Sequence, residues 1–274
     1  MDAVLLTTES EMDISVDLIG RLRNAKHVLV FTGAGVSAES GIPTFRDALT
    51  GLWERFDAEA LATPGAFQND PALVWGWYEW RRMKVLRARP NPAHHAIAAL
   101  ETKVARLTLV TQNVDDLHER AGSSNVLHLH GRLNAPFCFA CRRPADYPDG
   151  VPDEPEGGRR VEPPRCSCGG RIRPGVVWFG EMLPEIEWDA ANDAANQCDV
   201  LLCIGTSSVV QPAASLTMMA IQRGAITIQI NPNPTVLDDR VTLKLSGQAG
   251  VALPELVEAV WGAGRWQLLG VYSR

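Results

Sequence analysis

The sequence has little of several features that would place a protein in a specialised class. It contains no run of about 18 apolar residues, the length that a membrane-spanning helix needs. Residues 1–11 carry no lysine or arginine and no long apolar stretch, which argues against a secretory signal. The 26 basic residues are outnumbered by 32 acidic ones, and a formal charge of −6 gives little support to nucleic-acid binding. We expect a cytoplasmic protein with no membrane partner and no nucleic-acid partner.

Cysteine is also scarce, with six residues in 274, too few for a disulfide scaffold. Four of them form two knuckles among turn-forming residues, Cys138-x-x-Cys141 and Cys166-x-Cys168. Two such knuckles can surround one tetrahedral zinc ion, and because sulfur would fill all four positions, we expect the zinc to be structural. A redox pair and a chance clustering are the alternatives. Cys198 and Cys203, beside and within an apolar run, are interpreted as small core residues.

The chain is long enough, and with 46% hydrophobic residues apolar enough, to bury a substantial core. Apolar runs of strand length occur at 28–31, 107–110, 126–129, 200–204 and 226–230. Helices are predicted at 13–24, 71–88, 92–102, 184–197, 212–223 and 253–261, several with proline in the first turn. This alternation predicts an α/β fold, a doubly wound parallel sheet with helices on both faces.

Two segments interrupt that alternation. Residues 44–89 are helical in pattern and rich in tryptophan, and residues 135–174 are rich in Pro, Gly, Arg and Cys, the composition of a loop-built module. We interpret both as insertions that form a small domain, one a helical module and the other the zinc module. The large domain then comprises residues 1–43, 90–134 and 175–274.

A glycine-rich turn follows the apolar run at 27–31. Gly33-x-Gly35-x-x-Ala38 fits the fingerprint of a dinucleotide-binding turn, in which glycines let backbone amides approach a pyrophosphate and a helix begins near Val36. The loop that follows, Gly41 to Asp47, contains a proline, an aromatic residue and an arginine, where an ordinary Rossmann domain would continue into a second strand. The alternative is a glycine turn with no ligand.

Polar side chains follow two other predicted strands. Gln112, Asn113 and Asp115 come after the strand at 107–110, at an edge where open α/β sheets form ligand crevices. Side chains alternate along a strand, so His128 and His130 are predicted to lie on the same face, at the end of the strand at 126–129. A histidine there is suited to accept a proton near neutral pH, although a ring that only satisfies a backbone group is the alternative.

The combination of motifs resembles the sirtuin family in kind and in order. The resemblance covers roughly Ala25 to Ala249 and rests on the segments at 33–46 (GAGVSAESGIPTFR), 111–115 (TQNVD), 129–131 (LHG), 176–181 (VVWFGE), 205–207 (GTS) and 231–233 (NPN), together with the four cysteines. It implies an NAD-consuming protein-lysine deacylase with a Rossmann-type large domain and a small domain built from a zinc module and a helical module. Such an enzyme produces nicotinamide, O-acyl-ADP-ribose and free lysine, and its partners are acyl-lysine proteins or peptides.

The resemblance also implies roles for individual residues. His130 is the general base, and Asn113 belongs with it to the catalytic residues. NAD is contacted by Gly33, Ala34, Gly35, Phe45, Arg46, Gln112, Asn113, Asp115, Gly205, Thr206, Ser207, Asn231, Asn233 and Ala249. The substrate peptide lies as an added strand against the extended segment that contains Val176, Phe179, Gly180 and Glu181.

The acyl group is suggested by a pair of residues in the predicted helix at 71–88. Tyr78 and Arg81 lie three residues apart, on one stripe of that helix. A neighbouring acidic side chain would explain an arginine in an apolar stripe. Tyr-x-x-Arg also resembles the signature of class III sirtuins, in which it implies recognition of succinyl, malonyl or glutaryl groups, and the small Ala62 would widen the same pocket. We expect negatively charged acyl groups to be preferred to acetyl.

Three other functions compete with the deacylase. A mono-ADP-ribosyltransferase would cleave the same cofactor and pass the ribose to a protein. A non-catalytic NAD or ADP-ribose-binding module would use the zinc module to recruit a partner. A zinc-ribbon nucleic-acid binder would use the arginines at 142, 143, 159, 160 and 165, which form a local basic patch on an acidic protein.

Overall fold

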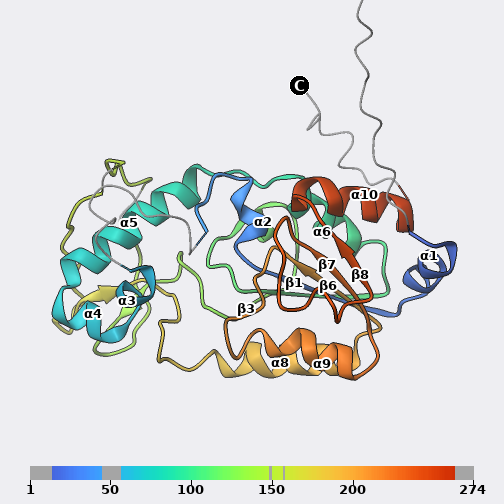
Figure 1. Ribbon diagram of the computed structural model, residues 1–274. Helices are drawn as coiled ribbons and strands as arrows, with labels where there is room; N and C mark the ends of the chain where they lie inside the picture. Colours follow the sequence, from blue (N-terminus) through green and yellow to red (C-terminus); the bar gives the residue numbers. More distant parts are fainter. Residues whose placement is uncertain (1–13, 45–56, 148–149, 157, 263–274) are drawn as a thin grey trace, which may run out of the picture.

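The large unit is built on a six-stranded parallel sheet. A computed structural model of the chain describes residues 14–44, 57–147, 150–156 and 158–262 (Figure 1). The strands are β1 (His27–Thr32), β2 (Arg106–Thr111), β3 (Val126–His128), β6 (Val200–Ile204), β7 (Ile226–Ile230) and β8 (Leu243–Leu245). Their order in the sheet is β3-β2-β1-β6-β7-β8, and every pair is parallel. The predicted parallel α/β sheet is therefore confirmed.

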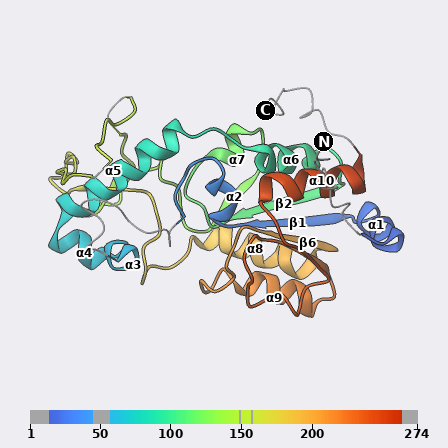
Figure 2. The ribbon, with the colours of Figure 1, turned by 45° about the horizontal axis from the view of Figure 1, so that its top comes forward.

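Side chains of the central strand divide between the two faces. In β1 every residue is buried, with Val28 and Val30 in one hydrophobic cluster and Leu29 and Phe31 in another. Helices α1 (Val16–Arg23), α6 (Pro92–Glu101) and α10 (Ala249–Trp261) cover the first face, and α8 (Glu185–Gln197) and α9 (Ser215–Gln222) cover the second (Figures 1 and 2). A strand covered on both faces reads as a continuous apolar run, which is why β1, β6 and β7 are visible in the sequence.

Successive strands are added to the two sides of β1 in opposite directions across the sheet. The chain passes from β1 to β2 and β3 on one side, and later from β6 to β7 and β8 on the other, so the winding reverses between β1 and β6. The carboxyl ends of these two strands thus form a topological switch point, the place where open α/β sheets bind ligands.

Several helices begin where the sequence predicts. The Asp70 side chain accepts a hydrogen bond from the Leu73 amide (3.1 Å) at the start of α5 (Pro71–Arg87), and Asn91 accepts one from the Ala93 amide (3.0 Å) at the start of α6. Each cap satisfies a backbone donor that has no partner within the helix. Within the described ranges, no helix has both the length and the apolar character that crossing a bilayer would require.

Three details differ from the prediction. Strand β8 was not predicted, because it is three residues long and only half buried. Helix α9 begins at Ser215 rather than residue 212, since the chain first makes a turn in which the Ser215 amide donates to the Pro212 carbonyl (2.9 Å). Helix α10 begins at Ala249, four residues earlier than predicted, and contains Pro254. The Glu39 carboxylate accepts a hydrogen bond from the Gly250 amide (2.8 Å) in the first turn of α10.

The two insertions pack together although they are far apart in sequence. The first contains α3 (Ala58–Leu61), α4 (Pro64–Asn69) and α5, and the second contains a two-stranded antiparallel sheet of β4 (Phe137–Cys138) and β5 (Ile172–Arg173). Phe67 and Trp77 from the first share one hydrophobic cluster with Ile172 and Trp178, which lie at and beyond the end of the second. The exact boundaries between the domains remain a prediction.

The segment between the two cysteine knuckles lies along α5. The Val161 amide donates to the Ala72 carbonyl (2.9 Å), and a β-carbon on Gly76 would lie 2.1 Å from the Arg159 carbonyl oxygen. The missing side chain at Gly76 thus lets the backbone of this segment contact the helix directly. The zinc module and α5 are in this way held together over much of the helix.

Candidate active site and metal site

The turns that follow β1 and β6 pack backbone against backbone at the switch point. The Gly33 amide donates to the Ile204 carbonyl (3.0 Å), and the Gly35 amide donates to the Gly205 carbonyl (2.8 Å). A β-carbon on Gly205, whose φ is +60°, would lie only 2.4 Å from the Val36 nitrogen. Only glycine fits this approach. It places the predicted cofactor residues of both turns side by side, namely Gly33, Ala34, Gly35, Gly205, Thr206 and Ser207.

The helix predicted near Val36 is a single turn, α2 (Gly35–Ala38). Its position is fixed from outside, because the Asn91 side chain donates to the Val36 carbonyl (2.8 Å) and to the Ser40 hydroxyl (3.1 Å). Phe45 and Arg46, which the sequence predicts to contact the cofactor, lie outside the described residues.

The end of β2 is tied to both glycine turns. The Gln112 side-chain amide donates to the Thr206 hydroxyl (2.9 Å), and the Asn113 side-chain amide donates to the Ser37 hydroxyl (3.1 Å). Asn113 is 7% exposed, so its amide is oriented within the protein rather than by solvent. The structure thus brings together three segments that are widely separated in sequence.

The end of β7 joins the same group. The Asn231 side chain donates to the Thr206 carbonyl (2.8 Å) and accepts from the Asn233 amide (3.2 Å). Asn231 is buried and Asn233 is exposed, while Ala249 is buried as the first residue of α10. Asn231 therefore shapes the turn after β6, and the Asn233 side chain faces the outside.

Buried polar side chains hold the Asn113 amide in place through the Ser37 hydroxyl. The His94 Nδ1 accepts from the Asn91 amide (3.3 Å), so its Nε2 carries the proton and faces the Ser37 hydroxyl (3.4 Å). Burial lowers the pKa of His94 to about 2, which keeps the ring neutral. The Ser37 hydroxyl donates to Asp115, whose pKa is nevertheless raised because burial disfavours its charged form. One hydroxyl thus connects Asn113, His94 and Asp115.

His130 lies in the turn that follows β3. Its Nδ1 lies 3.0 Å from the Gln112 carbonyl oxygen, which can only accept, so Nδ1 carries the proton and Nε2 keeps a lone pair. Burial lowers the pKa of His130, and the bond to Gln112 opposes this shift only in part. The ring is therefore neutral at pH 7 and suited to act as a base. His128 contacts the neighbouring carbonyl of Asn113 (3.1 Å), and both rings lie against the same segment.

The predicted substrate segment lies between His130 and the helical module. The Val177 amide donates to the His130 carbonyl (2.8 Å), and the Phe179 amide donates to the Ala62 carbonyl (2.9 Å). The sequence predicts an extended strand here, but the structure has only an isolated antiparallel bridge between Val176 and Gly131. A turn follows, because Gly180 has φ +86° and the Glu181 amide donates back to the Trp178 carbonyl (2.9 Å).

Hydrogen bonds within the protein hold the Glu181 carboxylate in place. The carboxylate accepts from the Arg173 guanidinium (2.9 Å) and from the Trp178 amide (2.8 Å). These bonds keep its pKa low although burial acts to raise it. The carboxylate therefore shapes the turn, whereas the Phe179 side chain is 42% exposed.

Tyr78 and Arg81, the pair predicted to recognise the acyl group, lie on α5, close to this turn. Tyr78 is 5% exposed, and its hydroxyl oxygen accepts a hydrogen bond from the Trp178 indole (3.0 Å). Arg81 is half buried, with its guanidinium carbon 5.4 Å from the centre of the Trp77 ring. Ala62 is buried and meets the segment through its carbonyl. The structure thus places Tyr78 and Ala62 against the predicted substrate segment, with Arg81 next to Tyr78 in the α5 stripe.

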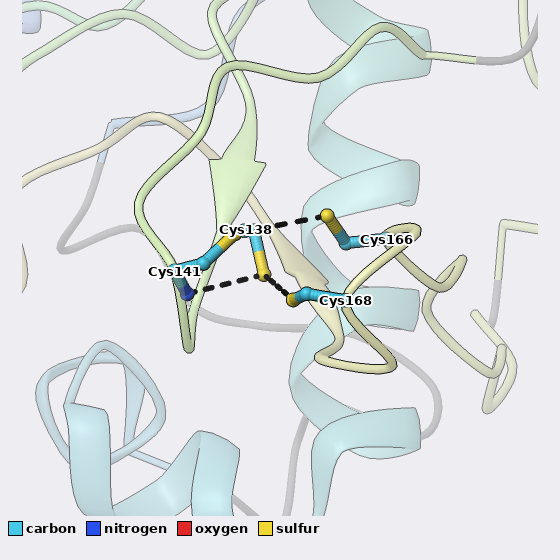
Figure 3. Close-up of side chains that lie close together, drawn as sticks. All are labelled: Cys138, Cys141, Cys166 and Cys168. Atoms are coloured by element: carbon cyan, nitrogen blue, oxygen red, sulfur yellow. Dashed lines mark hydrogen bonds between the residues drawn. The ribbon is translucent and has the colours of Figure 1, made fainter.

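The four clustered cysteines converge from two loops (Figure 3). Their sulfur atoms all lie within 4.8 Å of one another, with Cys138 and Cys168 3.5 Å apart and Cys141 and Cys166 3.8 Å apart. Four sulfurs about 2.3 Å from a tetrahedral zinc ion would be about 3.8 Å apart, so the spacing fits this metal. A β-carbon on Gly170 would lie 2.8 Å from the Cys138 sulfur, so glycine keeps the space clear.

This donor set fits one structural zinc ion. Because four sulfur atoms would fill its tetrahedral coordination, no coordination site would remain for a reacting water. The Arg143 guanidinium contacts the Cys141 sulfur (3.3 Å) and lowers the pKa of that thiol to about 6, which favours the thiolate that binds metal. Cys198 and Cys203 are buried elsewhere, in the cluster beneath α8 and α9, as predicted for core residues.

Sequence reasoning missed several residues that shape the site. Ser37 and His94 were not singled out, although a serine inside the glycine motif and a histidine in the first turn of a helix were visible signals. Trp178 and Arg173 had no signal of their own, since nothing in the sequence shows that the indole reaches Tyr78.

Comparisons with known proteins agree with this geometry. The sequence model described as Sir2 family matches residues 33–212. The chain is 60% identical over 250 residues to the NAD-dependent protein deacylase of Methylococcus capsulatus, which covers 91% of this chain and 98% of that protein.

Solved structures are similar over nearly the whole chain. A mutant Sir2 homologue in complex with 2'-O-acetyl ADP ribose has a TM-score of 0.83 and 45% identity, covering 95% of this chain and 100% of the homologue. The Sir2–p53 peptide–NAD+ complex has a TM-score of 0.76 and 29% identity, covering 89% and 97%. Together with the family match, these similarities show that the chain belongs to the Sir2 family.

Proposed function

We propose that this protein is an NAD-dependent protein-lysine deacylase that prefers succinyl or malonyl groups to acetyl. The observation that carries the proposal is the position of His130. Its Nε2 lone pair is left free because Nδ1 donates to the Gln112 carbonyl (3.0 Å), and Gln112 in turn contacts the turn after β6. A neutral base thus lies next to Gln112, whose side chain reaches the switch point of the sheet.

The two glycine turns support NAD as co-substrate. Their close approach leaves no side chains between backbone and ligand, and the amide-bearing side chains of Gln112, Asn113 and Asn231 surround them. An asparagine follows β7, where a dehydrogenase would carry an acid that binds the ribose hydroxyls. When bound, NAD would supply the ribose that receives the acyl group.

The roles of the surrounding residues follow from their contacts. Asn113 is held by Ser37 and Asp115 so that its amide orients the nicotinamide ribose, a positioning effect. His130 would take a proton from a ribose hydroxyl through Nε2 and hold it during acyl transfer. Backbone carbonyls of the 176–179 segment would receive the substrate peptide through bonds that demand little of its sequence, because the Val177, Trp178 and Phe179 amides already donate within the protein.

The acyl preference rests on Tyr78, Arg81 and Ala62. An arginine and a phenol are hydrogen-bond donors that suit a carboxylate, and Arg is the residue that best recognises one in a fork geometry. Ala62 is buried and bonded to the segment through its carbonyl, and its small side chain would allow a longer acyl chain than a larger residue would. A dicarboxylic acyl-lysine is the substrate that uses all three features.

The test is an assay of matched acetyl-lysine and succinyl-lysine peptides with and without NAD, followed by mass analysis of the products. We expect nicotinamide and free O-acyl-ADP-ribose to form together with unmodified lysine, only when NAD is present. ADP-ribose attached to protein or peptide would instead indicate a mono-ADP-ribosyltransferase. Absence of nicotinamide release in a single turnover would indicate a binding module. His130→Ala is the control and should abolish deacylation.

A further inference from the structure

Trp178 connects the predicted substrate segment to α5, the helix that carries Tyr78 and Arg81. It is 1% exposed, and its indole N–H donates to the Tyr78 hydroxyl oxygen (3.0 Å). Its backbone amide donates to the Glu181 carboxylate (2.8 Å), and the Arg173 guanidinium carbon lies 3.4 Å from the centre of its ring. The side chain therefore contacts both elements at once.

The direction of the bond to Tyr78 is fixed by chemistry. An indole has one N–H donor and no acceptor, so the phenol oxygen must accept, and the phenol proton must point elsewhere. The charged groups that act on this phenol are the guanidinium groups of Arg81 and Arg173, which are donors only, and the Glu181 carboxylate, which accepts from Arg173 and the Trp178 amide instead. Among the residues that the structure describes, no acceptor for the Tyr78 proton is found.

The indole is also held in a single orientation. Its ring lies 5.3 Å from that of Phe67 and 6.3 Å from that of Phe139, centre to centre, with Arg173 stacked on it. Arg173 is fully buried and donates to the Val176 carbonyl (2.7 Å) as well as to Glu181. A ring packed in this way cannot turn its N–H away from Tyr78 without disturbing the cluster.

We propose that Trp178 is a positioning residue for acyl recognition: by holding the Tyr78 oxygen as an acceptor, it makes the phenol proton available to an anionic oxygen at the end of the acyl chain. This inference rests on the proposed preference for dicarboxylic acyl groups and assigns part of that preference to a residue outside the Tyr-x-x-Arg pair. The contact with the acyl carboxylate belongs to Tyr78, and Trp178 acts through it.

The test compares Trp178→Phe, Tyr78→Phe and the double variant on matched succinyl-lysine and acetyl-lysine peptides. Trp178→Phe keeps an aromatic ring beneath Arg173 and removes the N–H donor together with part of the buried indole, so its effect on acetyl-lysine peptides measures the packing loss. We expect it to raise the KM for the succinyl peptide by about tenfold relative to that for the acetyl peptide, with little change in the ratio of the kcat values. In the Tyr78→Phe background, Trp178→Phe should change the succinyl-to-acetyl ratio by less than about twofold.

The outcomes separate the inference from the proposed function. If the unaltered protein shows no preference for succinyl, the acyl assignment itself is wrong. If it does prefer succinyl but Trp178→Phe lowers both activities equally, Trp178 has only a structural role and the inference is overturned. Should Trp178→Phe unfold, Tyr78→Phe decides alone, because an unchanged succinyl KM in that variant also overturns the inference.

Discussion

The contact between the two glycine turns predicts a specific defect on replacing Gly205 with alanine. The new β-carbon would lie 2.4 Å from the Val36 nitrogen, about 1 Å closer than ordinary contact, so the two turns must separate. Overpacking of this size costs about 1–3 kcal/mol, and the left-handed φ of +60° costs an alanine about 1–2 kcal/mol more. Separation would also break the bond between Gln112 and Thr206 (2.9 Å).

The expected result is a rise in the KM for NAD of about tenfold or more, since each factor of ten corresponds to about 1.4 kcal/mol. The KM would be measured with saturating acyl peptide, alongside the urea midpoint of unfolding. Gly224→Ala is the matched control, because Gly224 has a φ of +83° and no atom within 4 Å of an added β-carbon. It should lose stability but keep its KM for NAD. Equal KM values for the two variants would refute the assignment of these turns to the cofactor site.

Three further predictions follow from the site and its surroundings. Because burial lowers the pKa of His130 and the neutral ring is the base, kcat/KM should rise with pH and level off with an inflection below 6.5; an inflection well above 7 would contradict this role. Burial lowers the pKa of His118 to about 4, so the free energy of unfolding should fall as pH decreases from about 6.5 to 4. His118→Asn should make that dependence less steep in urea titrations, with the remainder due to the other buried histidines; an unchanged slope would contradict this. Arg81→Met should reduce kcat/KM for desuccinylation by about ten- to a hundredfold, the size expected for a hydrogen bond between charged groups, and deacetylation much less; equal losses would remove the carboxylate assignment.

The sheet was largely predictable because its central strands are buried on both faces. The runs at 200–204 and 226–230 coincide with β6 and β7, since each contains five consecutive buried residues. Strand β8 was not visible, because an alternation of leucine and lysine over three residues carries almost no signal. The start of α10 was also missed, since the Glu39 carboxylate that caps it comes from more than 200 residues earlier.

The site was predictable at the level of motifs but not of contacts. Glycines, amides and His130 follow strands in the sequence, and the rule that parallel strands end at one edge places them together. The orientation of Asn113 depends on Ser37 and His94, which come from two other segments. The bond between Trp178 and Tyr78 joins residues 100 positions apart, and no local pattern encodes it.

The shared cluster of the two insertions has a thermodynamic consequence. Phe67 and Trp77 share one hydrophobic cluster with Ile172 and Trp178, so separating the two modules would expose apolar surface on both. We therefore expect α5 and the cysteine knuckles to unfold as one cooperative unit. Ordering of α5 would then offset part of the favourable free energy of metal binding. Release of the metal and loosening of that helix would be linked equilibria. An acyl-lysine ligand that tightens α5 would, by the same linkage, raise the affinity for zinc at a site that it never touches.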